Sequence, residues 1–600
     1  MDKSEDNKAE CDHFLCSYLP AMQPEIIYKY PQKDIKGLEI NSLAASICFT
    51  DGIKVCYEDS EDCIKTVKNY RSSFTNQVGD RFFAVVYHFY LKMKNCDFEN
   101  LYTVTPIKNK LNTYEENDID SFFNDELPEE ILNKLNIYEK MNMKENVYIP
   151  YCLCLISKYP FIEQMEKCLE SIMISINKSD NEQNIDDLNK LITYIVKSIP
   201  APPKHSKIYF PLPYYNKFVE IQHPYYRDIT EFGDNPIFIL NCLSANTILC
   251  LFKLLIFEQK ILIIGKNNDI IAQIILNFVS LLYPFEWIHT YIPIMSEKMI
   301  KFLQSFLPFF LGMNTTLVNK ARPMLEKASK EVFIVNVDED KIELNENFLK
   351  INNKNIKTVS YIKKNYPSFP KNIENLILKE LKDIKVNYDK AKENYDKFNA
   401  NLRIKNLFFY VFVALLQDYK KYSYIIDDYP VFNSVLMIRE KKNDRQFYKE
   451  FTSTQLFQMF IQKSLFKDKD KRTHFDDFFE KFMELKKKGN GTNFIYKELY
   501  NEFNKEYIKY FQIKKKYIIK PFFIKEFKKF EEQFSTKKNK TMKLKNISLF
   551  LLNQYEQQED KNINAHGVLR ENQRIIRKPI ELNNDKDPKV YNIFLIPKKN

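Results

Sequence analysis

The most constraining feature of the chain is an alternation of apolar strand patterns with helical patterns between residues 236 and 337. Short continuous apolar runs predict strands buried on both faces, and longer runs with helical spacing lie between them. Such alternation is typical of a parallel sheet covered by helices on both sides. The predicted strands are 236–240, 260–265, 290–294 and 332–337, and the predicted helices are 244–258, 270–282 and one that ends at Phe306.

The only tryptophan in 600 residues, Trp287, lies in the run LLYPFEWIHTYIPI at residues 281–294. Pro284 ends the preceding helix, and an aromatic corner leads into the next strand. Two roles are open for the indole. Tryptophan is frequent in interface hot spots, which would suit a partner contact. We favour the other role, in which the ring packs the helix end against the sheet.

The flanking regions differ in character from the alternating segment. Residues 12–105 are typical of an antiparallel β module, because EIIYKY alternates polar and apolar residues and SFTNQVGDRFFAVVYHFY predicts a hairpin. Its turn is at Gly79 and Asp80, and Phe83, Val85, Tyr87 and Phe89 are expected on one face. We expect an acidic linker at 106–146, a central α/β lobe at 147–340, a helical connector at 341–400, a helical element at 401–466, a basic helical extension at 467–545 and a flexible tail at 546–600.

The net charge of +11 is concentrated in one segment, since residues 513–545 hold 12 Lys against 3 Glu. The rest of the chain is close to neutral, which argues against nucleic-acid binding. Phe and Ile are interspersed with lysine in this segment. It is either an amphipathic basic helix that docks on an anionic membrane surface, or it is rich in lysine only because the whole chain is. The sequence leaves both interpretations open.

Several function classes lack their motifs. MDKSEDNKAE has no signal-peptide core, no run is apolar enough to span a bilayer, and the 11 cysteines have no spaced framework, so we expect a reduced, cytoplasmic protein. Gly265 and Lys266 lack the other residues of a phosphate loop, and the seven histidines lack metal-ligand spacing. We therefore expect no catalytic residue, metal or cofactor.

Three blocks, in this order, resemble the DENN domain, a tripartite module that acts on Rab-family small GTPases. The upstream block contains FLCSYLPAMQPEIIYKYP, SICFTDGIKV and RFFAVVYHFY; the central block contains VYIPYCLCLISKYPF, NCLSANTILCLFKLLIFEQKILIIG, LLYPFEWIHTYIPI, PFFLGM and VFIVNVD; the downstream block contains LFFYVFVALLQDYKKY and QFYKEFTSTQLFQMFI. The structural signature residues are Pro150, Tyr159, Pro160, Tyr283, Pro284, Trp287 and Pro293. The central block is the most specific.

The resemblance implies a fold of class α/β plus α. Its parts are a longin-like N-terminal lobe with an antiparallel sheet, a flavodoxin-like central lobe with a doubly wound parallel sheet, and a helical C-terminal element, followed here by a basic helical tail. The activity that it implies is guanine nucleotide exchange on a Rab-family GTPase in membrane trafficking, at the cytoplasmic face of endomembranes. Such a factor binds the switch segments and favours the state that holds GDP poorly. The alternatives are a non-catalytic scaffold and a GTPase-activating role, for which Arg71 and Arg81 are the nearest arginines.

Five residues are candidates for contact with the GTPase: Asp51, Arg81, Lys158, Asn241 and Ser244. Asn241 and Ser244 follow the predicted strand 236–240, at the carboxyl edge where parallel sheets bind their ligands. Ser244 is equally suited to be a plain helix cap. Asp51 is favoured as a hairpin turn residue, and surface charge without a role is the default for Arg81 and Lys158.

Overall fold

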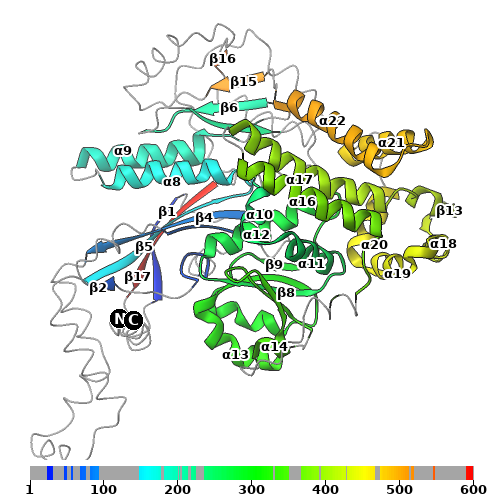
Figure 1. Cartoon of the computed structure of the whole chain (residues 1–600). Coiled ribbons are helices and arrows are strands. Elements are labelled where there is room, and N and C mark those ends of the chain that lie inside the picture. The colour runs from blue at the N-terminus through cyan, green and yellow to red at the C-terminus, as the bar shows by residue number, and fades with distance from the viewer. Residues whose placement is uncertain are drawn as a thin grey trace, which may run out of the picture.

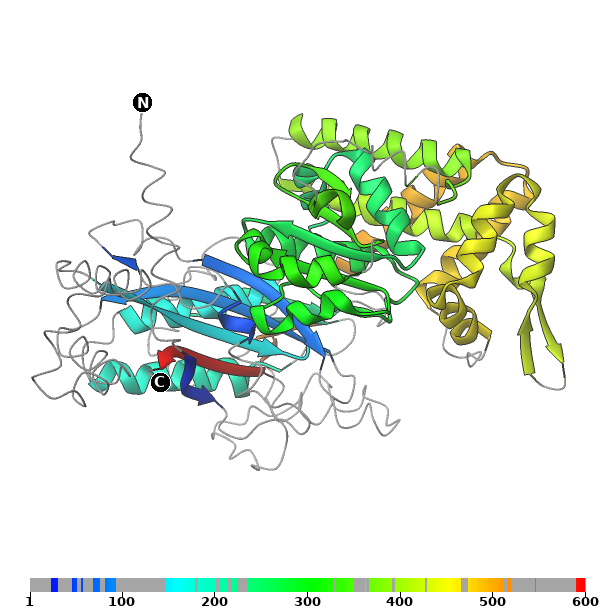
Figure 2. The ribbon, with the colours of Figure 1, turned by 90° about the horizontal axis from the view of Figure 1, so that it is seen from below.

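The computed structural model describes residues 23–30, 46–50, 56–57, 68–75, 81–92, 147–177, 182–200, 202, 206–213, 218–223, 235–328, 331–349, 362, 366–390, 394–426, 429–465, 473–511, 515–518, 545–546 and 590–598. They form a first lobe, a central lobe and a helical region, and Figure 2 shows the central lobe between the other two. Asp51, the hairpin turn at Gly79 and Asp80, and the expected acidic linker 106–146 lie outside the described residues.

The first lobe contains an antiparallel sheet with helices on one face (Figure 1). Its strand order is β1 (Gln23–Tyr30), β17 (Val590–Lys598), β5 (Val147–Ser157), β4 (Arg81–Lys92) and β3 (Lys68–Thr75), and β2 (Cys56–Tyr57) also pairs with β5. The covering helices are α8 (Ile162–Asn177) and α9 (Glu182–Thr193), which continues into a π-helical turn, η2 (Tyr194–Ser198). The predicted hairpin is confirmed as β3 and β4, paired antiparallel.

Both faces of the first sheet are buried around β4 and β5. On one face Val85, Phe89 and Leu153 pack against α8 and α9 in a shared core. On the other face Val86 and Cys154 join the core of the central lobe. Strand β5 pairs with β4 over most of its length, so the structure places it in the first lobe and not, as expected, in the central one. Strand pairing is non-local, and a buried strand pattern does not reveal which sheet it joins.

The central lobe is built on a five-stranded sheet with the order β12 (Lys341–Leu344), β11 (Phe333–Asn336), β8 (Lys260–Gly265), β10 (Phe309–Asn314) and β9 (Thr290–Ile292). All neighbours are parallel except β11 and β12. Ile261 and Ile263 face the core that contains α11 (Ala245–Ile256) and α12 (Asn268–Leu281). Leu262 and Ile264 face η3 (Glu297–Gln304) and α13 (Val318–Lys327). The sheet is therefore covered on both faces, as the alternation predicts.

Two elements of this lobe differ from the prediction. The strand predicted at 236–240 is wrong, because Ile237–Cys242 is a short helix, α10, whose first N–H (Ile237) donates to Asn401 Oδ1 over 2.8 Å. Four apolar residues are too few for periodicity to separate strand from helix, and α10 packs against α16 and α17.

Strand β10 was not predicted. At its Gly312 a Cβ atom would lie 1.9 Å from the Pro293 carbonyl oxygen, so only glycine fits there.

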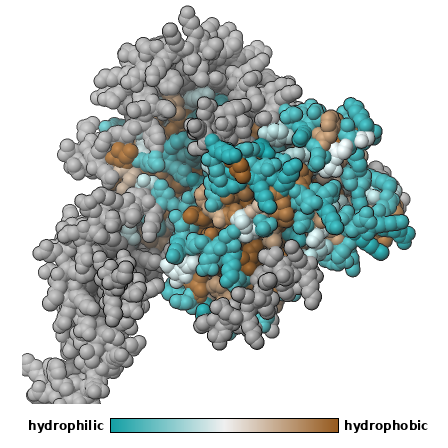
Figure 3. Space-filling view, in the orientation of Figure 1, coloured by the Kyte–Doolittle hydropathy of each residue, from teal (hydrophilic) through white to brown (hydrophobic). Residues whose placement is uncertain are grey.

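The helical region follows from residue 371. Its main helices are α16 (Lys371–Lys390), α17 (Asn394–Leu415), α18 (Ser434–Glu440), α19 (Arg445–Ser453), α20 (Gln455–Leu465), α21 (His474–Lys487) and α22 (Thr492–Phe511). The predicted helices 371–399, 402–419, 444–465 and 475–487 have the right type, but α17 already begins at Asn394 and the third predicted helix is divided at Thr454. The solvent side of α16 and α17 is mostly hydrophilic in Figure 3. A hairpin of β13 (Ser423–Ile426) and β14 (Tyr429–Phe432) projects from this region (Figure 2).

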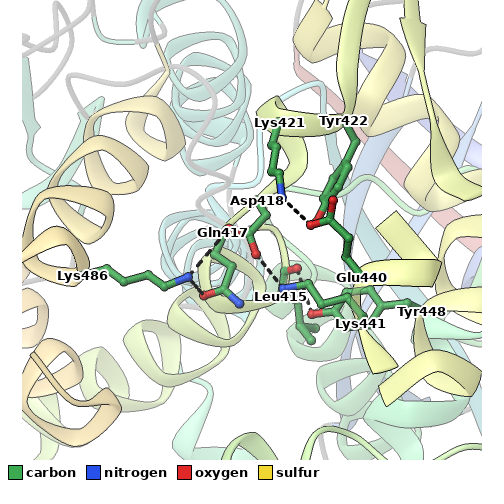
Figure 4. A network of polar contacts seen from close by, with 9 residues as sticks. All are labelled: Leu415, Gln417, Asp418, Lys421, Tyr422, Glu440, Lys441, Tyr448 and Lys486. Carbon is green, nitrogen blue, oxygen red and sulfur yellow. Dashed lines mark hydrogen bonds and ion pairs between the residues drawn. The ribbon is translucent and has the colours of Figure 1, made fainter. Parts of the chain in front are cut away.

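A network of charged residues fastens the outer end of the helical region (Figure 4). Asp418, just after α17, accepts a hydrogen bond from Lys441 Nζ over 2.6 Å and lies 3.7 Å from Lys486 Nζ of α21. Glu440 accepts from Lys421 and, over 3.0 Å, from the Tyr422 hydroxyl. These contacts join the end of α17 to α18 and α21.

The basic extension is only partly helical. After α22, residues Lys515–Ile518 form β15, which lies parallel to β6 (Ser206–Phe210) in a sheet ordered β16 (Lys545–Asn546), β15, β6 and β7 (Val219–His223). The expected basic helix is therefore wrong for these lysines, because pairing with β6 keeps KKYI extended. Strand β17 likewise lies in a tail for which the sequence shows no pattern.

Candidate functional site

The carboxyl edge of the central sheet gathers strand ends and helix starts from several parts of the chain. Strands β8, β10 and β11 end there at Gly265, Asn314 and Asn336. Helices α11 and α12 begin there with side-chain caps, Ser244 accepting from Thr247 N and Asn267 from Asp269 N and Ile270 N. Open parallel sheets place their binding sites outside this edge, where helix N-termini present N–H groups.

Six polar residues at this edge, Thr50, Lys266, Asn268, Asn314, Asp338 and Asp340, are here named the polar edge. Asn314 is 4% exposed, and its Nδ2 donates to the Lys266 carbonyl over 3.0 Å and to Asn268 Oδ1 over 2.8 Å. Its Oδ1 accepts from Thr316 N over 3.0 Å. One buried amide thus fixes the ends of β8 and β10 relative to each other.

The turn between β11 and β12 brings two aspartates to the same edge. Asp338 Oδ2 accepts from Lys266 N over 2.9 Å. Asp340 has a positive φ of 50° and its Oδ1 accepts from Ser244 N over 3.1 Å. Both aspartates are exposed, as is Lys266, so the edge presents charges of both signs to solvent.

The first lobe contacts the central lobe through polar groups next to this edge. Thr50 Oγ1 accepts from Asn268 Nδ2 over 3.1 Å. Arg71 of β3 donates to Glu166 Oε1 of α8 over 2.8 Å and lies 3.6 Å from Asp269 Oδ1 of α12. The polar edge is therefore continuous with the joint between the two lobes.

Burial at this joint shifts the protonation equilibria of its charged groups. Desolvation raises the pKa values of Glu166 and Asp269, and the Arg71 guanidinium opposes that rise at both carboxyls. Arg81 of β4 stacks over the Tyr291 ring of β9 at 3.6 Å from the ring centre, and burial lowers its pKa to about 10. Arg71 and Arg81 are thus engaged within the protein and are not extended toward a partner.

The structure brings some predicted contact residues together and separates others. Ser244 lies at the polar edge as a helix cap, while Asn241 lies on α10 and accepts from Lys385 Nζ of α16 over 3.0 Å. Its predicted place at a strand end is wrong, because that strand is absent. Arg81 and Lys158 lie at the same end of the β4–β5 ladder, where Phe83 pairs with Ser157. Lys158 is exposed.

The signature residues lie in the interior or at corners. Trp287 is 6% exposed, its Nε1 donates to the Thr290 carbonyl over 3.5 Å, and its ring meets Phe310 edge-on, so the favoured packing position is what the structure shows. The Tyr283–Pro284 peptide is cis, and the Tyr283 hydroxyl accepts from Phe475 N over 3.2 Å.

The other signature residues are placed as follows. Pro150 is buried opposite Tyr90, Tyr159 stacks on Phe161, Pro160 is half-buried beside it, and Pro293 packs on Gly312.

Sequence reasoning named none of the six polar-edge residues as a partner contact. Lys266 and Asn268 follow the buried strand KILIIG, and Asn314 ends FFLGMN. Polar residues at the ends of buried strands were therefore the sequence signal that could have indicated this site. Among the described residues, no group of three His, Cys, Asp or Glu side chains is placed to hold a metal ion. Within the same residues, no helix combines the length and apolar character that crossing a bilayer requires.

Comparison with known proteins matches the DENN (AEX-3) domain family model to residues 148–340. DENN domain-containing protein 3 of Mus musculus is 20% identical over 350 residues, which cover 55% of this chain and 25% of that protein. DENN domain-containing protein 2D of Homo sapiens is 27% identical over 251 residues, 41% of this chain and 47% of that protein. The Arabidopsis thaliana DENN domain and WD repeat-containing protein SCD1 is 23% identical over 181 residues, 30% of this chain and 15% of that protein.

The matched region includes nearly all of β5 and the whole of α8 in the first lobe, the parallel strands of the central sheet, and every polar-edge residue except Thr50. The chain spans less than half the length of each of these three relatives. Together the family match and the relatives support a DENN domain at residues 148–340 of this chain.

Proposed function

We propose that the chain is a guanine nucleotide exchange factor for a Rab-family small GTPase, and that the GTPase binds at the polar edge beside the first lobe. The observation that carries this proposal is the match of the DENN domain to residues 148–340, because proteins with this domain generally act as Rab exchange factors. In the same proposal, the first lobe is longin-like, the central lobe is flavodoxin-like, and the protein acts in membrane trafficking.

The polar edge has the chemistry for binding a switch segment. It offers exposed charges of both signs on a frame that the buried Asn314 amide keeps rigid. Switch segments of GTPases are ordered by nucleotide and Mg²⁺ contacts, so a surface that binds their released form shifts the equilibrium away from bound GDP. A thousandfold faster release needs about 4 kcal/mol of preference for that form, which an interface of ordinary size can supply.

The test measures release of labelled GDP from a panel of Rab proteins with the full chain and with two charge reversals. Lys266→Glu alters the polar edge, and Lys379→Glu alters a similarly exposed lysine on the solvent side of α16. We expect K266E to slow the stimulated release by on the order of tenfold, and K379E to leave it unchanged. Equal effects of the two variants, or no stimulation of any Rab, would overturn the proposal.

GTP hydrolysis measured in the same panel separates the alternatives. Faster hydrolysis would indicate a GTPase-activating role, although the engagement of Arg71 and Arg81 inside the protein disfavours an arginine finger there. Binding without either effect would indicate a scaffold.

The proposal also includes contact of the lysine-rich segment 513–545 with an anionic membrane. Unchanged vesicle binding after replacement of its lysines by glutamine would remove that part.

A further inference from the structure

The turn between η3 and β10 exposes apolar side chains at the opposite edge of the central sheet. Phe306 is 97% exposed, Leu307 65% and Phe302 39%, and these three residues are here named the apolar tip. Strand β10 begins at Phe309 beside the tip and ends at Asn314 on the polar edge. Ile288, 42% exposed, precedes the parallel neighbour β9 and adds a fourth apolar side chain at the amino edge.

The apolar tip is held in place by buried neighbours and by its own hydrogen bonds. Ile300 and Leu303 of η3 are 6% and 0% exposed, and Phe309 is 1% exposed, so both ends of the turn are anchored in the core. Within the turn, Ser305 N donates to the Phe302 carbonyl over 3.0 Å, and Leu307 N donates to Ser305 Oγ over 3.1 Å. The outward position of Phe306 therefore follows from the fold.

Cationic groups accompany the apolar tip. Lys298 and Lys301 of η3 are both exposed, and no ion pair joins either of them to another residue in the part of the chain that the structure describes. The nearby Glu297 is already paired with Lys320 over 2.8 Å. Residues three apart on a 3₁₀ helix lie on the same side, so the two lysines form one positive strip next to Phe302.

We propose that the apolar tip inserts into an anionic membrane surface. Apolar side chains that project from a rigid turn can enter the headgroup and acyl boundary, and lysines beside them meet anionic headgroups. A partner with an apolar groove would satisfy the ring of Phe306 but would leave the two lysines without counter-charges. Docking through the amino edge also leaves the polar edge of the same sheet free for the GTPase.

The first test reports insertion at the tip alone and needs no GTPase. Phe306→Trp adds an exposed indole to a chain whose single native tryptophan is buried. The probe is phosphatidylcholine vesicles with added phosphatidylserine, with bromine atoms on the acyl chains. We expect quenching of the new fluorescence in F306W, and none beyond wild type in Val435→Trp, which replaces a 68% exposed residue of α18. Equal responses of the two variants, or none in either, would overturn the proposal.

The second test measures co-sedimentation with the same vesicles. The double variant Phe306→Ser, Leu307→Ser should bind at least about tenfold more weakly, while the control Ile426→Ser, Val435→Ser should bind as wild type does. Reversal of both lysines (K298E, K301E) should weaken binding by a similar factor at low salt. The matched reversal K379E, K382E has the same spacing on α16 and should change it little.

Solution assays separate this proposal from the proposed exchange activity. F306S/L307S should leave GDP release in the absence of vesicles unchanged and should reduce it only for a GTPase held on vesicles. Loss of GTPase binding in solution with normal vesicle binding would overturn the proposal and make the tip a protein contact. Failure of exchange in every assay, with tip insertion intact, would overturn the proposed function alone.

Discussion

The central lobe meets its two neighbours through contacts of opposite chemistry. Toward the first lobe, Val86 and Cys154 share the core of the central lobe, and the contacts beside the polar edge are polar. They are a threonine hydroxyl, an arginine between two carboxylates, and Arg81 on Tyr291. Toward the helical region they are mainly aromatic. Phe285, in the elbow before Trp287, meets the rings of Phe412, Phe451 and Phe460. We name these contacts the polar joint and the aromatic junction.

The aromatic junction is continuous with the core. Phe252 of α11 meets Phe408 edge-on at 4.5 Å between ring centres, and Tyr283 stacks on Phe409. Polar contacts add to it: Glu258 accepts from Gln455 N and Leu456 N at the start of α20, over 2.8 and 2.7 Å. Close-packed rings tolerate little displacement. The central lobe and the helical region therefore behave as one body.

The polar joint is different because its groups are partly hydrated. The side chains of Arg71, Glu166 and Asp269 are each about a quarter exposed. Such pairs exchange protein contacts for water at small net free energy, so the side chains at this joint can rearrange at low cost while Val86 and Cys154 stay packed in the shared core. The proposed GTPase site lies beside this adjustable joint, away from the rigid aromatic junction. That arrangement suits a protein that must accommodate a switch segment as it changes shape.

The largest expected effect breaks the aromatic junction. Phe285→Ala removes a ring that is 4% exposed and leaves a cavity among three phenylalanines. We expect the free energy of unfolding to fall by about 3 to 5 kcal/mol in urea titrations followed by tryptophan fluorescence. Phe494→Ala, at a 50% exposed position on α22, is the matched control and should change it little. A loss below about 1 kcal/mol for F285A would mean that the junction does not unite the two regions.

Acid should weaken the same junction through His474. The imidazole is 2% exposed and stacks on Phe409, and burial lowers its pKa to about 4, although Asp477 opposes this. In the unfolded chain the imidazole has its ordinary pKa near 6.5, so below that pH the unfolded chain takes up a proton that the folded chain does not. The folded protein therefore keeps its full stability above pH 6.5 and loses stability as the pH falls toward 4. The loss reaches about 3 kcal/mol at pH 4. Urea titrations of wild type and His474→Phe at pH 7 and pH 4.5 should show a smaller loss in the variant, and equal losses would contradict the assignment.

The sequence predicts those parts of the central lobe whose signals are local. Strand β8 is a continuous apolar run, α12 has helical spacing, and Ser244 caps α11 as its position before an apolar helix suggests. The mixed α/β class and the helical C-terminal region follow from the same patterns. The predicted helix bounds are less accurate, since Thr454 interrupts a pattern that reads as continuous.

The wrong or missing predictions share one physical cause: the structure at those positions depends on contacts between distant segments. Strand β5 belongs to the first lobe only because it pairs with β4, and Ile237–Cys242 is helical where helices surround it. At the candidate site, Thr50 bonds to Asn268 across 218 positions, which no local pattern reveals. Ser244 was placed at the correct edge even though the strand used to place it does not exist.

The smallest effect on stability, and the sharpest test of the comparison, comes from the polar joint. Arg71→Met should lower the free energy of unfolding by roughly 1 kcal/mol at neutral pH. Burial already raises the pKa values of Glu166 and Asp269, and loss of the guanidinium raises them further. The folded variant then holds protons that the unfolded chain has released. Its loss of stability relative to wild type therefore grows as the pH rises above the ordinary carboxyl range and shrinks in acid, which is the opposite of the effect at His474.

The control Arg403→Met removes a similarly exposed pair, with Glu380, inside the helical region. Both variants should lose similar stability at pH 7. Only R71M should change the rate of GDP release, because only the Arg71 pair lies at the adjustable joint. Equal release rates in the two variants would remove the distinction between the polar joint and the aromatic junction.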